Sequence, residues 1–118
     1  MAKDTFNDEG AKRFLEAKEQ QEKEEQETTR KNLLQQVTAI LRKEFEGSTT
    51  EVYLIGSILQ PFSFSSRSDV DIVLKNYAGD RFEFWAKIEK QIGKKVEIIL
   101  FEKCHFQDFV LTNGLKVV

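Results

Sequence analysis

The sequence is poor in cysteine, histidine and proline, with one of each among its 118 residues. A lone Cys104 excludes an intramolecular disulfide. Cys104 and the adjacent His105 fall short of the three or four nitrogen and sulfur ligands that a zinc site needs. They also make a poor nucleophile and base pair, because neighbouring helical residues point apart and no companion acid is evident. Thiol catalysis and zinc chemistry are therefore disfavoured.

Long apolar runs and an excess of basic residues are absent as well. No apolar run approaches the length of a membrane span, and the N-terminus lacks the apolar centre of a signal peptide. We therefore expect no membrane association and a cytoplasmic protein. The net charge is −2, and residues 32–118 carry 11 basic and 11 acidic side chains. Affinity for a phosphate backbone needs a basic surface, so nucleic acid is disfavoured as a partner.

The composition divides the chain into two parts. Residues 1–31 are rich in Glu, Lys, Gln and Ala, which form helices readily, but they contain no large apolar residue after Leu15. A helix without an apolar face is solvated or frayed, so a polar N-terminal helical arm is predicted here. The arm is either simply exposed or binds a partner through Phe6, Phe14 and Leu15. Residues 32–118 are long enough for one domain with a modest core.

Apolar periodicity in this domain predicts alternating helices and strands. Steps of three and four residues predict two core-facing helices through Leu33, Leu34, Val37, Ile40, Leu41 and Phe45, and through Phe82, Trp85, Ile88 and Ile92. Apolar runs predict strands near residues 52–55, 69–74, 94–101 and 115–118, with a short helical face at 106–110. The order predicts an α/β (α+β) fold with a mixed, largely antiparallel sheet of about four strands and helices on one face.

Asp69 and Asp71 lie two residues apart at the start of the second predicted strand. Side chains along a strand alternate between its faces, so the two carboxylates should project into the same space. Like charges this close repel each other and raise a carboxyl pKa unless a cation lies between them. Hard oxygen ligands favour Mg²⁺. An Asp-x-Asp pair also occurs by chance in turns, so the pair alone is a weak motif.

Two further features support a site at this place. Gly56 and Ser57 end the preceding strand, where a missing Cβ, successive amides and a hydroxyl group can hold phosphate oxygens. Glu97 lies among apolar residues of the third strand, and burying an unpaired charge is costly. We infer that Glu97 points at the two aspartates and shares their metal. The alternative is an exposed strand glutamate paired with Lys95 or another lysine.

The loop over residues 58–67, between the first two strands, holds Phe62, Phe64, three serines and the single proline. Its aromatic side chains are expected to pack against the domain, and the alternative is a ring lying against a purine base. Its serine hydroxyl groups are candidate donors to phosphate.

Gly56 and Ser57, a spacer of about ten residues, and the sequence Ser-Asp-Val-Asp-Ile at 68–72 resemble the signature of the DNA polymerase β-like nucleotidyltransferase superfamily. Because the chain is short, it looks most like the minimal nucleotidyltransferase (MNT) domains that act as antitoxins beside HEPN-domain toxins. The resemblance runs from about residue 33 to residue 118. It implies the polymerase β-like nucleotidyltransferase fold.

The resemblance also implies an activity, Mg²⁺-dependent transfer of AMP from ATP to a hydroxyl group, here a tyrosine of a HEPN toxin. Two Mg²⁺ ions would clamp the attacking and leaving oxygens. The implied catalytic and metal-binding residues are Asp69, Asp71 and Glu97, and the implied nucleotide-binding residues are Gly56, Ser57, Ser68 and Arg67.

The chain departs from the family pattern at two positions. The third carboxylate is usually Asp in the family and is Glu97 here. An Arg often follows the Gly-Ser pair, where this chain has Ile58, and Arg67 is the candidate replacement. The alternative reading is a catalytically weak or inactive antitoxin or binding module that neutralises its partner by occlusion. Transfer to RNA or to an antibiotic would need more acceptor-binding surface than 118 residues provide. Self-association is left open.

Overall fold

The computed structural model describes the backbone of residues 2–118 and the side chains from residue 9 onward. Helices and strands alternate along the chain, in the order that the apolar pattern predicts. The elements are α1 (Ala2–Glu44), β1 (Glu51–Ile55), η1 (Ser57–Leu59), β2 (Val70–Lys75), α2 (Arg81–Ile92), β3 (Val96–Leu100), η2 (Phe101–Lys103), α3 (Gln107–Asn113) and β4 (Leu115–Lys116).

The strands form one four-stranded sheet in the order β3-β2-β1-β4. β1 is antiparallel to both β2 and β4, whereas β2 and β3 are parallel. The predicted α+β fold, with a mixed and largely antiparallel sheet, is therefore confirmed. The register places Ile55 beside Asp71 and Asp71 beside Glu97.

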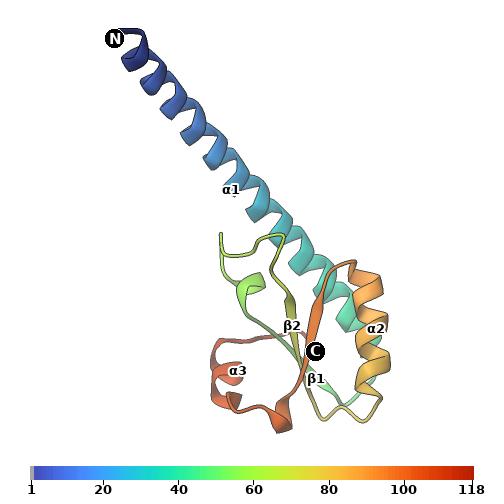
Figure 1. Ribbon diagram of the computed structural model, residues 1–118. Coiled ribbons are helices and arrows are strands. Elements are labelled where there is room, and N and C mark those ends of the chain that lie inside the picture. Colours follow the sequence, from blue (N-terminus) through green and yellow to red (C-terminus); the bar gives the residue numbers. More distant parts are fainter. Residues whose placement is uncertain (1) are drawn as a thin grey trace.

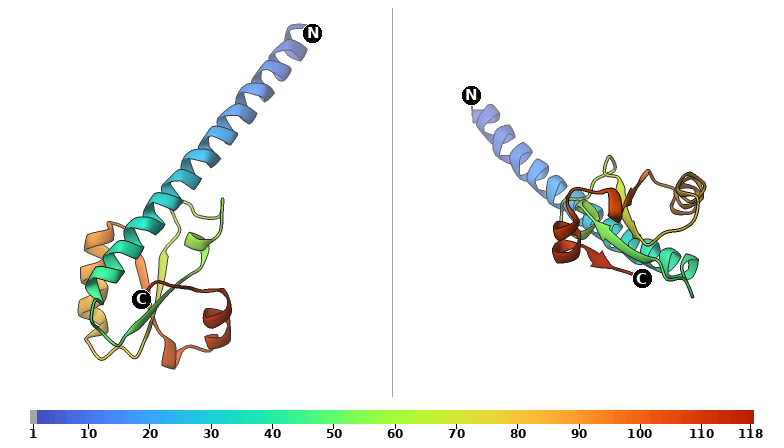
Figure 2. Two further views of the ribbon diagram at one scale, coloured as in Figure 1. Left: turned by 180° about the vertical axis from the view of Figure 1, so that it is seen from behind. Right: turned by 90° about the horizontal axis from the view of Figure 1, so that it is seen from below.

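Helix α1 is one continuous helix of 43 residues that extends far beyond the sheet (Figures 1 and 2). Its C-terminal part is buried on one face through Val37 and Leu41, while residues 9–26 are exposed. Of the predicted partner anchors, Phe14 and Leu15 are 68% and 56% exposed, and the side chain of Phe6 lies outside the described residues. The division into an arm and a domain after residue 31 stays a prediction, because the helix passes through it without interruption.

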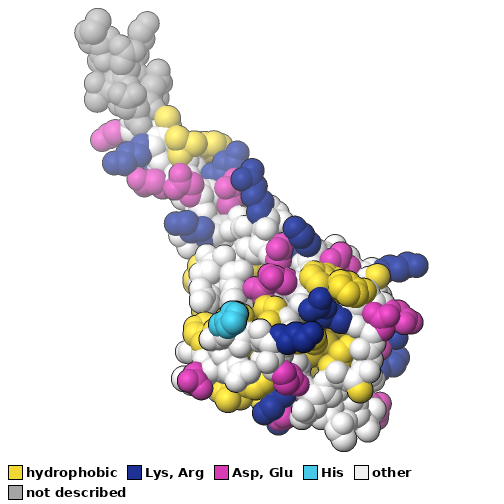
Figure 3. Space-filling view, turned by 60° about the horizontal axis from the view of Figure 1, so that its bottom comes forward, with side chains coloured by type: hydrophobic (Ala, Val, Ile, Leu, Met, Phe, Trp, Pro, Cys, Tyr) yellow, Lys and Arg dark blue, Asp and Glu magenta, His cyan; other side chains and the backbone are white. Residues whose placement is uncertain are grey.

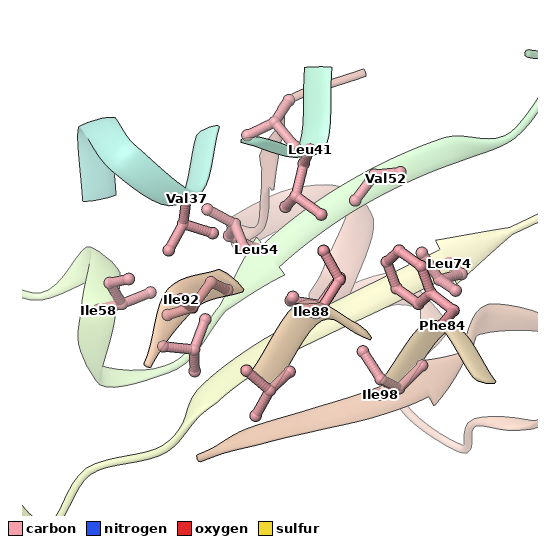
Figure 4. Packing of buried hydrophobic residues seen from close by; sticks show 14 of the residues in the cluster. Val37, Leu41, Val52, Leu54, Ile58, Leu74, Phe84, Ile88, Ile92 and Ile98 are labelled. Carbon is pink, nitrogen blue, oxygen red and sulfur yellow. The ribbon is translucent and has the colours of Figure 1, made fainter. Parts of the chain in front are cut away.

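The main core lies between the sheet and the two longer helices. Val37 and Leu41 of α1 face Val52 and Leu54 of β1, and Ile88 of α2 lies among them (Figure 4). α2 begins after Asp80, whose Oδ1 accepts hydrogen bonds from the amides of Phe82 and Glu83 at 2.9 and 3.2 Å. Such N-capping satisfies amides that have no partner within the helix, so the local sequence fixes where α2 starts.

The opposite face of the sheet carries a second, smaller apolar cluster. Its buried members are Tyr53, Ile55, Val73, Phe101 and Val110. Because Val110 belongs to α3, this short helix packs on the face opposite α1 and α2. The prediction that the helices lie on one face of the sheet is correct for α1 and α2. It is wrong for α3, which lies on the other face. Alternating side chains of β1 supply both clusters, which is why its apolar run is continuous.

No helix among residues 2–118 is long and apolar enough to cross a membrane.

Candidate active site

The acidic residues of the candidate site lie on the sheet face that also carries α3. Asp71 of β2 and Glu97 of β3 are direct neighbours in the parallel register, so their side chains leave the sheet on the same side. Val70 and Ile72 on either side of Asp71 point into the main core and are fully buried. The predicted orientation of Glu97 toward the aspartate pair is therefore present at Asp71. Glu97 is nevertheless exposed, so its charge is not buried as the sequence argument assumed.

Asp71 is half-buried and electrostatically unfavourable as an anion. Burial, the negative charge of Glu97, a hydrogen bond between the two carboxyl groups and the charge of Asp69 raise the pKa of Asp71 from 3.8 to about 6. Desolvation and a nearby like charge both favour the neutral acid. A cation next to Asp71 and Glu97 would remove this penalty, and their oxygen atoms are of the type that Mg²⁺ prefers.

Asp69 lies just before β2, so no strand pairing fixes its backbone. It is close enough to influence the pKa of Asp71. Among the described side chains, however, no three His, Cys, Asp or Glu residues together form a group that could hold a metal ion. Mg²⁺ is often bound by one or two carboxylates plus waters and substrate phosphates, so Asp71 and Glu97 fit one ion. The site with three carboxylates and two ions stays a prediction.

Gly56 brings the end of β1 directly against Asp71. A Cβ added to Gly56 would lie 2.5 Å from Oδ2 of Asp71, and the glycine has a φ of +85°. Residues with a Cβ rarely adopt this backbone conformation, and no side chain fits between the two groups. The chain turns sharply here because β1 ends at Ile55, which pairs with Asp71. The predicted juxtaposition of the Gly-Ser turn and the acidic residues is thus present.

Ser57 begins the short helix η1 and is half-buried. The amides of Leu59 and Gln60 donate hydrogen bonds to the carbonyl groups of Gly56 and Ser57, both at 3.1 Å. These bonds hold a tight turn immediately after β1. The side chain of Ile58 within the turn is fully buried in the main core, which anchors the turn to the sheet.

Ser68 and Arg67 occupy the loop that leads into Asp69. The Oγ of Ser68 accepts a hydrogen bond from the Ser65 amide at 3.0 Å, so this hydroxyl group already holds the loop. The amide of Arg67 donates to Ser65 Oγ at 3.3 Å, and the side chain of Arg67 is exposed. The structure therefore assigns Ser68 a contact within the loop and leaves Arg67 at the surface.

The aromatic residues of the same loop differ in their surroundings. Phe64 is 4% exposed and belongs to the main core, as expected for packing. Phe62 is 62% exposed and has a φ of +62°.

Cys104 is half-buried against the second cluster, whereas His105 is exposed.

Sequence reasoning missed two residues that contact this loop. Glu27 and Arg30 lie in the polar half of α1, yet they are only 7% and 6% exposed. Hydrophobic periodicity gives no signal for them, because both are charged and their helical neighbours are polar. Their spacing of three residues is that of a helical ion pair, and this was the one available clue.

One face of the domain is mixed in charge. On the face seen in Figure 3, Lys and Arg side chains lie among Asp and Glu side chains. This agrees with the balance of charges in residues 32–118. Affinity for a phosphate backbone depends on a basic patch or stripe, so the visible surface gives no separate support for a polynucleotide.

Comparison with known protein families identifies a match over most of the chain. A family model, described as the poly(A) RNA polymerase, mitochondrial-like, central palm domain, matches residues 9–117. This range contains most of α1, the whole sheet and every residue of the candidate site. No curated protein matches the chain significantly, and neither does any solved structure.

Proposed function

Since the chain belongs to the family of mitochondrial-like poly(A) RNA polymerase central palm domains, which are polymerase β-like nucleotidyltransferase palms, we propose that it transfers AMP from ATP to a hydroxyl group. The observation that carries the proposal is the pair of carboxylates Asp71 and Glu97 directly beside the Gly56 turn. Palms of this type generally use divalent metals and nucleoside triphosphates, so the family supports nucleotidyl transfer at this general level.

The residues of the chain have distinct roles in the proposed reaction. Asp71 and Glu97 would hold Mg²⁺, which when bound neutralises charge on the reacting phosphate and lowers the pKa of an acceptor hydroxyl group. Gly56 would let a phosphate group approach the main chain closely, and Ser57 would donate its hydroxyl group to a phosphate oxygen. Asp69, whose charge acts on Asp71, would add further negative charge beside the metal. Pyrophosphate would leave as the hydroxyl oxygen attacks the α-phosphate.

Two kinds of acceptor are proposed. The matching family is named after a poly(A) RNA polymerase. The 3′ hydroxyl group of an RNA is therefore the first acceptor to test. The second candidate is a tyrosine of a HEPN-type toxin, with the chain acting as an antitoxin. The balanced charge of residues 32–118 favours this second candidate, because RNA binding relies on a basic surface. A non-catalytic antitoxin that acts by occlusion is the remaining alternative, and the exposed Phe14 and Leu15 would be its contacts.

The test uses ATP labelled at the α-phosphate, with Mg²⁺ present or replaced by EDTA. An oligo(A) RNA and a purified HEPN-domain protein are offered as acceptors in separate reactions. We expect labelling of one acceptor, with loss in EDTA and a fall of at least about 100-fold in Asp71→Asn and Glu97→Gln, because the metal and its charge compensation are lost. Asp108→Asn and Glu46→Gln alter exposed acids that are not among the groups that raise the pKa of Asp71, and they are the matched controls.

Two results would contradict the proposal. One is labelling that persists unchanged in Asp71→Asn. The other is a wild-type chain that neither labels an acceptor nor binds ATP at millimolar concentration in calorimetry. The second result would favour the non-catalytic binding module.

A further inference from the structure

Glu27 and Arg30 form a buried ion pair in a helix segment whose surroundings are exposed. Arg30 Nε lies 2.6 Å from Glu27 Oε1, and Arg30 Nη2 lies 2.8 Å from Oε2. This arrangement is bidentate, the strongest geometry for a guanidinium and a carboxylate. Every other side chain between residues 9 and 32 is exposed. The segment therefore contacts the domain through two charged side chains rather than through an apolar face.

The remaining hydrogen bonds of the pair go to the main chain of the loop that follows the Gly-Ser turn. Arg30 Nη1 donates to the carbonyl oxygen of Ile58 at 2.8 Å. Glu27 Oε1 accepts from the amide of Phe62 at 3.0 Å. The pair thus holds both ends of residues 58–62. The side chain of Ile58 anchors this segment from the core, and the pair fixes its main chain from the helix.

The main chain of Phe62 has an unfavourable conformation that the ion pair holds in place. It has a φ of +62°, a conformation that costs free energy for a residue with a Cβ. Such strain persists only where the surroundings determine the conformation. Here the Glu27 carboxylate holds the amide of the strained residue itself. An apolar contact between α1 and the loop would attach the loop without imposing this backbone geometry.

Stability alone is a weak reason for the pair. Removing two charges from water is costly, and replacing a buried ion pair by apolar residues of similar volume is often neutral or stabilising. What an ion pair with four defined hydrogen bonds provides is a fixed geometry. The segment that it fixes begins one residue after Ser57, whose turn lies against Asp71.

We propose that Glu27 and Arg30 are positioning residues that hold the Gly56–Ser57 turn in its nucleotide-binding conformation relative to Asp71. The inference rests on the proposed function, because it assigns the turn to the phosphate groups of the nucleotide. It also gives the C-terminal end of the polar segment of α1 a role in nucleotide binding, through contacts that are entirely with the main chain of the loop.

The test separates positioning from folding by replacing the pair with apolar residues. In Glu27→Leu/Arg30→Met the segment keeps its bulk and loses its four hydrogen bonds. We expect the midpoint of thermal unfolding to fall by several degrees, because the Phe62 amide and the Ile58 carbonyl group lose their partners, and the Kd is therefore measured at a temperature at which the variant is fully folded. We expect the Kd for Mg²⁺-ATP to rise at least about tenfold, because the turn is no longer held in register with Asp71. Glu9→Leu/Lys12→Met, an exposed pair with the same spacing, is the control.

Two further measurements show whether the rise in Kd comes from a loosened turn. Amide hydrogen exchange of residues 57–62 should accelerate in the double variant and not in the control. Arg30→Lys, which keeps a donor for Ile58, should recover part of the ATP affinity that Arg30→Met loses.

The outcomes distinguish this inference from the proposed function. A wild-type chain that binds no Mg²⁺-ATP overturns the proposed function, and the positioning role with it. A wild-type chain that binds Mg²⁺-ATP, together with a double variant of equal Kd, overturns only the inference drawn here.

Discussion

The carboxylate of Asp71 stands directly over Gly56, with Oδ2 2.5 Å from the position that a Cβ would take. Asp71 belongs to β2 and Gly56 directly follows the antiparallel strand β1, and the register places Asp71 beside Ile55, one residue before the glycine. The close approach is therefore built into the strand pairing. Glycine is therefore required at position 56 for two reasons. The turn needs its positive φ, and Asp71 leaves no room for a side chain.

Gly56→Ala should accordingly damage both folding and nucleotide binding. The new methyl group would clash with Asp71, and alanine at a φ of +85° adds backbone strain. We expect a loss of about 1–3 kcal/mol in the free energy of unfolding and no measurable ATP binding by calorimetry. Gly47→Ala is the control, because Gly47 has a φ of +76° and no atom within 4 Å of an added Cβ. Equal losses in the two variants would show that the clash with Asp71 is unimportant.

Asp71→Asn should stabilise the protein at pH 8 in the absence of divalent cations. The pKa of Asp71 is raised from 3.8 to about 6, so the folded state binds the proton more tightly than the unfolded state. The favourable contribution is complete below pH 3.8 and is lost as the pH rises through 6. Because the carboxyl group is only half-buried, solvent screens part of this effect, and we expect the variant to exceed wild type by about 1–2 kcal/mol at pH 8 in EDTA.

Urea unfolding at pH 8 and pH 4 measures this difference. The advantage of Asp71→Asn should shrink toward pH 4, where the wild-type carboxyl group is itself protonated. Mg²⁺ at pH 8 should raise the stability of wild type more than that of the variant. A variant that is less stable than wild type at pH 8 in EDTA would contradict the repulsion between Asp71 and Glu97. Asp108→Asn changes an exposed aspartate and should show neither effect.

Glu27 should give the protein an opposite pH dependence in acid. Its hydrogen bond with Arg30, followed by that from the Phe62 amide, lowers the pKa of Glu27 from 4.5 to about 2. The stabilisation is therefore complete above pH 4.5 and is lost as the pH falls through 2. We expect wild type to lose stability more steeply than Glu27→Gln between pH 4.5 and 2. Denaturant midpoints across this range test the difference, with Glu22→Gln, at an exposed position, as the control. Parallel curves would show that the carboxylate is not held by Arg30.

Truncation of α1 should reveal where the helix begins to matter for folding. A chain that starts at Gln21 loses only side chains that are exposed or outside the described residues. We expect its free energy of unfolding to stay within about 0.5 kcal/mol of the full chain. A chain that starts at Lys31 also loses Glu27 and Arg30, which leaves the Phe62 amide and the Ile58 carbonyl group without partners, so a loss of about 1–3 kcal/mol is expected. Equal stability of the two truncated chains in thermal unfolding would contradict a structural contact at Glu27 and Arg30.

The apolar pattern was enough to predict the order of elements and most of the main core. Val37, Leu41, Ile88 and Ile92 recur at helical spacing, and all four are buried. Phe82, predicted on the same face of α2, is 68% exposed, and Phe84 is buried in its place. The same local reasoning placed Asp71 and the Gly-Ser turn at neighbouring strand ends, because strand alternation and a short connection constrain them. These predictions depend on contacts that each strand or helix makes through its own periodic face.

Features that depend on contacts between distant segments were not predictable in this way. Arg30 and Ile58 are 28 residues apart, and nothing in a run of charged helix formers indicates that one of them is buried. The position of α3 behind the sheet depends on Val110 meeting Tyr53 and Ile55, which the apolar pattern of α3 cannot specify. Glu97 is exposed, as in the alternative interpretation that the sequence left open, whereas the preferred interpretation assumed that its charge is buried.

The sheet separates the main core from the carboxylates of the proposed site. Along β2, Ile72 and Leu74 enter the main core while Asp71 leaves on the other side. A replacement at Asp71 or Glu97 therefore alters the charge that a ligand meets and leaves the packing under α1 and α2 untouched. The domain can therefore remain folded when Asp71 and Glu97 are replaced. A domain of this kind that lacked both carboxylates would thus keep the same backbone and remain available as a binding protein.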